Sequence, residues 1–294
     1  MTELDAWDIS QLLARYGHIV DNSEWPELAA VFTADAVLEC RDEQVTGLDA
    51  ITRHLQEQSD RSAHHTVNTQ LDEDTHGVRA RSRIVVIGYD AAVHSSDVVD
   101  TIVRTADGWR ISRRQDRRRT RSARSASDPR SSSDARPRSD PVPSQNRMEP
   151  VAARDGYPIL DVLARYAHVI DNADWDRLGT VFTPDVTFRG SRSAVRGWAG
   201  IADMIGAVRP YYPHHTTDVM LGARGDGTVR AWSKYFIVRD DGTAGSGDYL
   251  DTLVKTHDGW RVHDRRISRG HRAPHDPGGA SERTFTFELW QSWS

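Results

Sequence analysis

The chain has 294 residues, a net charge of −5 and a hydrophobic content of 37%, with Cys40 as its one cysteine. The length allows about two ordinary domains, the small charge excludes a strong general attraction to nucleic acid or membranes, and one cysteine excludes an intrachain disulfide. Because the N-terminal segment is acidic and no apolar stretch approaches the ~20 residues that cross a bilayer, we expect a soluble, cytoplasmic protein.

The sequence contains an internal repeat. Residues 9–40 and 159–190 are identical at 14 of 32 positions with a constant offset of 150, which also aligns His64-His65 with His214-His215. Each unit is long enough to bury its own core, whereas the Arg-, Ser- and Pro-rich stretch between the units is too poor in apolar residues to fold. We therefore predict a first domain over 1–118, a disordered linker over 119–152, a second domain over 153–271 and a C-terminal extension over 272–294.

Hydrophobic periodicity predicts the elements of one unit in chain order. Ile9, Leu12, Leu13, Tyr16, Ile19 and Val20 recur at helical spacing, and the second unit shows the same face. A short helix, a strand, a third helix and a meander of four strands joined by tight turns are expected to follow. The ranges are 24–32, 36–40, 47–58, 64–72, 78–88, 93–105 and 108–117. This order predicts an α+β fold, with helices covering one face of a curved sheet.

The C-terminal extension carries one further signal. Residues 284–290 alternate between apolar and polar side chains with a period of two, and a Pro- and Gly-rich break precedes them. This pattern predicts an added strand that pairs with the edge of a sheet.

Polar residues that occur in both units are the candidates for chemistry. Tyr16 with Asp21 is matched by Tyr166 with Asp171, and each aspartate lies where the first helix is expected to end. A carboxylate at a helix C-terminus opposes the helix dipole unless a partner compensates for it. The alternative is that Asp21-Asn22 only ends the helix and begins a turn.

The paired histidines are the second candidate. Adjacent side chains of a strand face opposite sides, so one member of each pair can face a pocket, and the more polar face favours His64 and His214 over His65 and His215. A nearby aspartate would fix the tautomer of the imidazole and raise its basicity. The alternative is a surface histidine, or a buried one bonded to the backbone. Because adjacent histidines diverge, we predict no metal site.

The third repeated feature is the Asp-Gly-Trp-Arg hairpin, preceded by Asp100 in the first unit and by Asp251 in the second. Asp-Gly is typical of a tight turn, the tryptophan is expected in the core, and Arg110 and Arg261 are interpreted as structural.

The pattern Tyr-x4-Asp-x3-Trp-x2-Leu-x2-Val-Phe, followed by the His-His strand and the Asp-Gly-Trp strand, resembles the SnoaL-like families of the nuclear transport factor 2-like superfamily. The subgroup of scytalone dehydratase and bile-acid 7α-dehydratase is the most similar. The resemblance covers both units, but neither the linker nor the extension. It implies two tandem cone-shaped domains, each with three helices packed on a curved, mostly antiparallel sheet around a pocket.

The resemblance also implies roles for residues. The catalytic set would be Tyr16, Asp21, His64, Tyr166, Asp171 and His214. The residues lining the substrate pocket would be Trp25, His65, Asn68, Trp175, His215, Asp218 and Tyr235. A slip of one residue in register would move the acid–base role to His65 and His215. The second histidine that scytalone dehydratase carries on its middle strands has no match in either unit.

These observations predict a cofactor-independent acid–base enzyme, a dehydratase or a cyclase or isomerase of natural-product biosynthesis. Its substrate would be a small hydrophobic ketone of polyketide-like or polycyclic type. Two alternatives stay open: a non-catalytic module of the same fold that binds a ligand or partner, and an epoxide hydrolase. The two units are expected to form a dimer-like pair within one chain, or the chain to form a homodimer.

Overall fold

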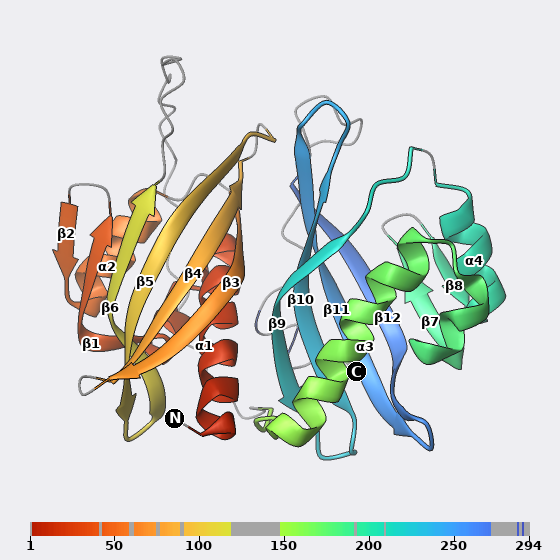
Figure 1. Cartoon of the computed structure of the whole chain (residues 1–294), viewed down its shortest axis with the longest axis horizontal. Helices are drawn as coiled ribbons and strands as arrows, with labels where there is room; N and C mark the ends of the chain where they lie inside the picture. Colours follow the sequence, from red (N-terminus) through yellow and green to blue (C-terminus); the bar gives the residue numbers. More distant parts are fainter. Residues whose placement is uncertain are drawn as a thin grey trace.

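The computed structural model describes residues 2–40, 43–58, 62–74, 77–88, 91–118, 148–190, 193–208, 210–271, 287 and 290. Most of the expected linker and most of the C-terminal extension lie outside the described residues. The model contains two similar halves, here called domain 1 and domain 2, which lie side by side (Figure 1).

Domain 1 consists of a long helix, a 3₁₀ helix, a strand pair, a second helix and a meander of four strands. Its elements are α1 (Glu3–Asn22), η1 (Trp25–Ala30), β1 (Phe32–Cys40), β2 (Glu43–Thr46), α2 (Leu48–Glu57), β3 (Ala63–Asp74), β4 (Gly77–Ile87), β5 (Val93–Thr105) and β6 (Gly108–Arg118).

Domain 2 repeats this order. Its elements are α3 (Ala153–Asp171), η2 (Trp175–Thr180), β7 (Phe182–Arg189), β8 (Ala194–Arg196), α4 (Gly197–Gly206), β9 (His215–Ala223), β10 (Val229–Val238), β11 (Ala244–Thr256) and β12 (Gly259–His271).

Each domain has one six-stranded sheet, ordered β2-β1-β6-β5-β4-β3 and β8-β7-β12-β11-β10-β9. All pairs are antiparallel except β1 with β6 and β7 with β12. The predicted α+β fold with a mostly antiparallel sheet is confirmed. Two details differ from the prediction: β2 and β8 were not expected, and the segment expected as a helix over 24–32 is the 3₁₀ helix η1. There the Val31 N–H donates to Leu28 O, an i to i−3 bond that keeps the turn tight.

The Asp-Gly turns between the last two strands close the meanders as predicted. Gly108 and Gly259 have positive φ angles of 105° and 102°, which glycine adopts without steric cost. The arginines that follow reach back to the 3₁₀ helices, where Arg110 donates to Ala29 O and Arg261 donates to Gly179 O. These arginines therefore tie the last strand to the helical layer.

Helix α1 is buried on two sides, unlike α3. One side carries the apolar residues that pack on the sheet of domain 1, and the other side contacts β9 of domain 2 (Figure 1). The Trp7 indole donates to Val151 O at 2.8 Å, and Met220, Trp232 and Leu250 of domain 2 join the apolar cluster of domain 1. The two domains therefore share part of one core.

The C-terminal extension contributes to this shared core. Its two described residues, Phe287 and Trp290, are helical and buried, and both rings contact Trp232. The expectation of a strand is wrong at these two positions, because a spacing of three residues places both aromatic side chains on one face of a helix.

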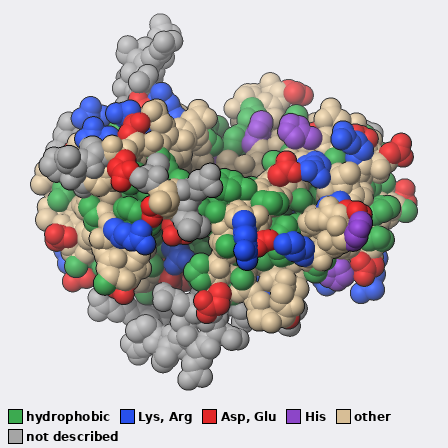
Figure 2. All heavy atoms as spheres, turned by 60° about the horizontal axis from the view of Figure 1, so that its bottom comes forward, with side chains coloured by type: hydrophobic (Ala, Val, Ile, Leu, Met, Phe, Trp, Pro, Cys, Tyr) green, Lys and Arg blue, Asp and Glu red, His purple; other side chains and the backbone are tan. Residues whose placement is uncertain are grey.

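Surface charge is mixed. Figure 2 shows basic and acidic side chains interspersed over one face of both domains, with the visible histidine side chains on domain 2. Half-exposed arginines of domain 1 pair with carboxylates of neighbouring strands, as Arg81 does with Asp72 at 3.0 Å and Arg113 with Glu39. None of the helices formed by the described residues combines the length and apolar character that crossing a membrane requires.

Candidate active site

An aspartate at the end of the first helix meets a histidine at the start of a strand in each domain. His64 Nδ1 donates to Asp21 Oδ1 at 2.6 Å, and His214 Nδ1 donates to Asp171 Oδ1 at 3.0 Å. The other carboxylate oxygen accepts from the backbone N–H of the same histidine, at 2.9 and 3.0 Å. Within each histidine pair, it is therefore His64 and His214 that meet the aspartate.

These hydrogen bonds compensate for the unfavourable position of each carboxylate at the C-terminal end of its helix. The chain turns at Ser23 and Ala173, which have positive φ angles of 57° and 53°, so each helix stops just after its aspartate. The carboxylate near the negative helix terminus is compensated by two donors from the strand. The interpretation of Asp21 as only a helix terminator therefore leaves its contacts unexplained.

In domain 2 a tyrosine completes the arrangement. The Tyr211 hydroxyl donates to Asp171 Oδ1 at 2.6 Å and lies 3.2 Å from His214 Nδ1. Burial alone would raise the pKa of Asp171, but the hydrogen bonds from His214 and Tyr211 outweigh burial and lower its pKa. Asp171 is therefore ionised at neutral pH and holds the Nδ1 proton of His214.

Aromatic rings surround His214 in domain 2. The Tyr166 and Tyr235 rings lie 6.4 and 5.8 Å from the His214 ring, and Tyr235 stacks on Tyr249 at 4.5 Å. The side chains of His214 and Asp171 are 21% and 17% exposed, whereas Tyr166 is 1% exposed. The acid–base pair thus faces solvent, and the tyrosines lie behind it.

A buried ion pair lies beneath the ring of Tyr16 in domain 1 and beneath that of Tyr166 in domain 2. Arg265 binds Asp251 through two hydrogen bonds of 2.7 Å, and its guanidinium carbon lies 3.9 Å from the centre of the Tyr166 ring. Arg114, Asp100 and Tyr16 repeat this arrangement in domain 1, with a stacking distance of 3.8 Å. Burial raises the pKa of Tyr166 although Arg265 opposes this shift, so the hydroxyl stays protonated.

A family model described as the SnoaL-like domain matches residues 2–115 and, a second time, residues 152–266. The chain belongs to the SnoaL-like domain family. The two matches together cover more than half of the chain, and each covers one of the two SnoaL-like domains described above.

Solved structures also resemble single SnoaL-like domains of this chain. Rv3472 from Mycobacterium tuberculosis, a protein of unknown function, is 22% identical, with 40% of this chain and 78% of that chain covered and a TM-score of 0.38. An NTF2-like protein from Novosphingobium aromaticivorans is 24% identical (40% and 84% covered, TM-score 0.37). ActVI-ORFA from Streptomyces coelicolor is 20% identical (39% and 96% covered, TM-score 0.35). Among curated proteins, none matches this chain significantly.

The site of SnoaL-like domain 1 differs from that of SnoaL-like domain 2 in two ways. Lys234, which belongs to β10 of domain 2, forms an ion pair with Asp21 Oδ2. The positions of Tyr235 and Tyr249 are occupied in domain 1 by Ile84 and Val98, at the offset of 151 that applies to these strands. Domain 1 therefore keeps the acid–base pair and Tyr16 but lacks counterparts of Tyr235 and Tyr249.

Four of the residues predicted to line pockets lie elsewhere. His65 is fully buried between the domains, where it bonds Thr217 Oγ1 and Ser246 Oγ, and His215 stacks on Phe236. Asp218 accepts from the Thr66 N–H of domain 1 at 3.0 Å. Asn68 and Asp218 both have positive φ and occupy equivalent strand bulges. We therefore leave His65, His215, Asn68 and Asp218 out of the proposed site.

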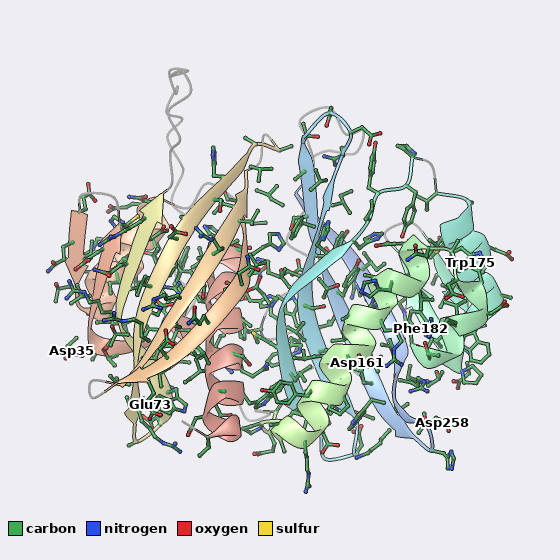
Figure 3. All side chains as sticks on the ribbon, viewed as in Figure 1. Asp35, Glu73, Asp161, Trp175, Phe182 and Asp258 are labelled. Atoms are coloured by element: carbon green, nitrogen blue, oxygen red, sulfur yellow. The ribbon has the colours of Figure 1, made fainter. Side chains whose placement is uncertain are left out.

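The tryptophans predicted to line pockets are half-buried at the edges of the two cores. Trp25 packs against the apolar cluster of domain 1, and Trp175 packs against that of domain 2. Trp175 approaches Gly206 at the end of α4, in the part of domain 2 that is remote from domain 1 (Figure 3). Their contacts are those of core residues.

Arg114 and Arg265 were missed by the sequence interpretation, and the contact of Tyr211 with Asp171 was not predicted. Arg114 and Arg265 occupy equivalent positions at the offset of 151, so their repetition was a signal that could have been used. Tyr211 lies in a loop, and nothing in the sequence marks its contact with Asp171.

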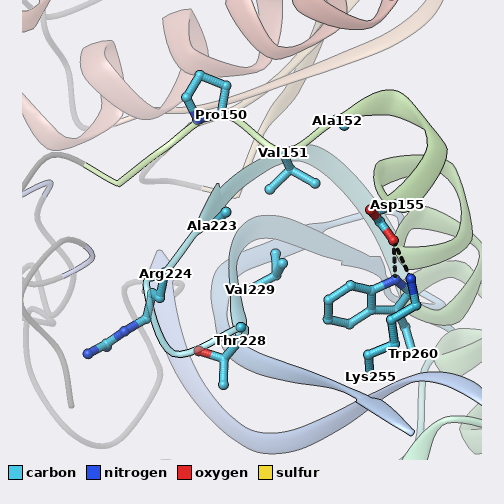
Figure 4. A pocket seen from close by; sticks show the side chains of 11 residues that line it. Pro150, Val151, Ala152, Asp155, Ala223, Arg224, Thr228, Val229, Lys255 and Trp260 are labelled. Atoms are coloured by element: carbon cyan, nitrogen blue, oxygen red, sulfur yellow. Dashed lines mark hydrogen bonds and ion pairs between the residues drawn. The ribbon is translucent and has the colours of Figure 1, made fainter. Parts of the chain in front are cut away.

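Two surface hollows lie apart from the acid–base pair. One, of about 260 Å³, is lined by the β9–β10 turn and the start of α3, where Asp155 binds both Lys255 and Trp260 (Figure 4). The other, of about 320 Å³, contains Arg224 and Arg230. Neither is lined by His214 or Asp171.

Asp218 is expected to make stability depend on pH. Burial raises its pKa to about 7, although hydrogen bonds from Thr66 and Thr217 oppose the shift. The native state then holds this proton more tightly than the unfolded chain, so its contribution is full below about pH 4 and is lost as pH rises to about 7. The expected loss is up to about 4 kcal/mol.

Chemical denaturation of wild type and Asp218→Asn between pH 4 and 8 checks this expectation. Asparagine tolerates the positive φ of 47° at this position, so the variant removes the titration and keeps the backbone. The difference in unfolding free energy between the two proteins should change steadily from pH 4 to pH 7. Parallel pH profiles would contradict the expectation.

Proposed function

We propose that domain 2 is a cofactor-independent acid–base catalyst, a dehydratase or a cyclase or isomerase, that acts on a hydrophobic polyketide-like or polycyclic ketone. The observation that carries the proposal is the contact of Asp171 with both His214 and Tyr211, next to the ring of Tyr166. An ionised carboxylate, an oriented imidazole and a protonated phenol are the groups that proton transfer next to a carbonyl requires.

The geometry supports a separate role for each group. Because Nδ1 of His214 donates to Asp171, Nε2 carries the lone pair and is the atom that takes the proton next to the substrate carbonyl. Asp171 stabilises the imidazolium that forms. Tyr166 keeps its proton and donates a hydrogen bond from its hydroxyl to the oxygen of the developing enolate, and the charge of Arg265 beneath the ring supports this role.

The enolate then loses water or closes a ring. In a dehydration, the histidine that removed the proton returns it to the departing hydroxyl group, so the enzyme ends in its starting protonation state. The tyrosine rings next to His214 supply an aromatic, apolar surface that suits a flat polycyclic substrate.

Deuterium uptake tests the proposal without knowledge of the natural substrate. Wild-type protein in D₂O is expected to speed exchange of the protons next to the carbonyl of 2-tetralone and related polycyclic ketones, as followed by NMR. Exchange at the rate of buffer alone across the whole panel would contradict the proposal.

Tyr211→Phe is expected to lower the rate of uptake about tenfold, because a hydrogen bond to a charged group is worth about 1.5–3 kcal/mol and part of it orients the base. The substitution keeps the ring and removes only the hydroxyl. Tyr157→Phe, at an exposed tyrosine of the same domain, is the control and should leave the rate unchanged. Equal rates in the two variants would show that Tyr211 has no role in proton transfer.

A second candidate function is a non-catalytic module that binds a ligand or partner. It is favoured by the burial of Tyr166 and by the two surface hollows that lie apart from His214. Under this function, substitution of Asp171 or His214 would leave every exchange rate at the value of wild type.

A further inference from the structure

Strand β9 is the edge of the domain 2 sheet, and domain 1 contacts it at successive residues. The His65 ring bonds the Thr217 hydroxyl at 2.9 Å, and the Thr66 N–H donates to the Asp218 carboxylate at 3.0 Å. The His18 ring donates from Nε2 to Asp218 O at 2.7 Å. These contacts cover the part of β9 that begins three residues after His214.

A glutamine of α1 binds the free edge of the same strand. Gln11 donates to Val219 O at 3.1 Å and accepts from the Leu221 N–H at 2.8 Å. Its side-chain amide thus replaces the neighbouring strand that an edge strand lacks. The backbone of β9 is held on one side by β10 and on the other by domain 1.

Lys234 anchors this interface from the opposite direction. It projects from β10, is 3% exposed, and binds the Asp21 carboxylate and Gly17 O of α1. Burial lowers its pKa to about 8, while Asp248 opposes the shift, so the ammonium group is charged at neutral pH. Without Lys234, Asp21 would keep the two hydrogen bonds from His64 but lose its buried cationic partner, which would weaken the docking of the two domains.

The residues that join domain 1 to β9 have equivalents in the other domain, but among the described residues these equivalents make no matching contacts. The residue of α3 that is equivalent to Gln11 is Asp161, which is 64% exposed, and the equivalent of His18 is the exposed His168. The equivalent of Lys234 is Arg83, which pairs with Asp97 of its own domain. Domain 1 therefore holds a strand of domain 2, whereas the matching residues of domain 2 do not hold domain 1.

We propose that domain 1 is a positioning domain: through the Lys234–Asp21 pair and the contacts of α1 and β3, it holds β9, and with it His214, in register with Asp171. The inference rests on the proposed function of domain 2. It assigns the acid–base pair of domain 1 to docking, with Asp21 engaged by Lys234. Lys234 and Gln11 are positioning residues that act through His214.

The chain offers a matched control, because Lys234 and Lys255 are its only lysines. In the full-length protein, Lys234→Met is expected to speed hydrogen exchange of peptides covering 214–223 at least tenfold, as measured by mass spectrometry. The maximum rate of deuterium uptake by 2-tetralone should fall about tenfold with KM within twofold, and the NMR titration of His214 should shift. Lys255→Met, at an exposed lysine, should change none of these.

Gln11→Leu is the second variant, and it tests whether domain 1 positions β9 if Lys234→Met does not fold. It keeps the size of the side chain and removes both hydrogen bonds to β9. It should speed hydrogen exchange at 219–221 and shift the His214 titration in the same direction as Lys234→Met does. Wild-type exchange of β9 in the folded variants would overturn the inference. Faster β9 exchange with an unchanged His214 titration would also overturn it, because the role would then be structural only. Hydrogen exchange of β9 and the His214 titration can be measured even if the wild type does not exchange the protons of 2-tetralone. Failure of the proposed function is therefore distinguished from failure of this inference.

Discussion

Asp171→Asn is expected to lower the rate of proton abstraction in domain 2 by 10²–10⁴-fold, the typical contribution of one acid–base pair. Asparagine keeps the size of the side chain, but its neutral amide does not stabilise the imidazolium that forms on His214. The amide can also present an N–H donor to Nδ1, which favours the wrong tautomer and places a proton on Nε2. Deuterium uptake by 2-tetralone at saturating concentration measures the effect.

His64→Gln is the matched control, because His64 is the equivalent of His214 in domain 1 and its ring is bonded to Asp21. We expect its uptake rate to stay within about threefold of wild type. A loss in His64→Gln as large as in Asp171→Asn, with hydrogen exchange of β9 at the wild-type rate, would show that both domains catalyse. Full activity of Asp171→Asn would remove the carboxylate from the mechanism.

Arg265→Met is expected to destabilise domain 2 by about 3–5 kcal/mol, because it leaves the Asp251 carboxylate buried without its cation. Both members of the pair are fully buried, and the guanidinium also packs against Tyr166 and Tyr249. The double variant Asp251→Leu with Arg265→Met removes both charges and should recover most of the loss. Calorimetry or urea denaturation of the full chain measures the difference.

Arg177→Met provides the comparison at the surface of the same domain. Arg177 is largely exposed and lies 3.8 Å from Asp174, so its removal should change stability by no more than about 0.5 kcal/mol. If Arg265→Met were as stable as Arg177→Met, the Asp251–Arg265 pair would not contribute to the free energy of unfolding. It would then be retained for its effect on Tyr166.

The sequence predicted the pairing of strand histidine and helix-end aspartate because it follows from local rules. Alternation along a strand left one histidine of each pair for the pocket, and the helix dipole demanded a partner for Asp21 and Asp171. The repeat added weight, since both features occurred twice at one offset. The α+β order could be predicted for the same reason, from periodicities that each segment carries within itself.

Contacts that depend on register or docking could not be predicted. Asp251 was recognised, but its partner Arg265 is fourteen residues away on the next strand, and which residues face each other depends on the bulge in β12. His65 and Asp218 are polar and follow the pocket histidines, so the sequence placed them in pockets, whereas the packing of the domains buries them between β3 and β9.

Phe287 and Trp290 have a consequence for the order in which the molecule matures. They are synthesised after both SnoaL-like domains, yet they complete the apolar cluster that α1 begins, together with Trp232 and Leu250. Domain 1 is therefore synthesised before domain 2 but completed after it. Its nascent form carries an open apolar surface through the synthesis of some 170 further residues, which exposes it to chaperones and to misassembly until Phe287 and Trp290 have been made.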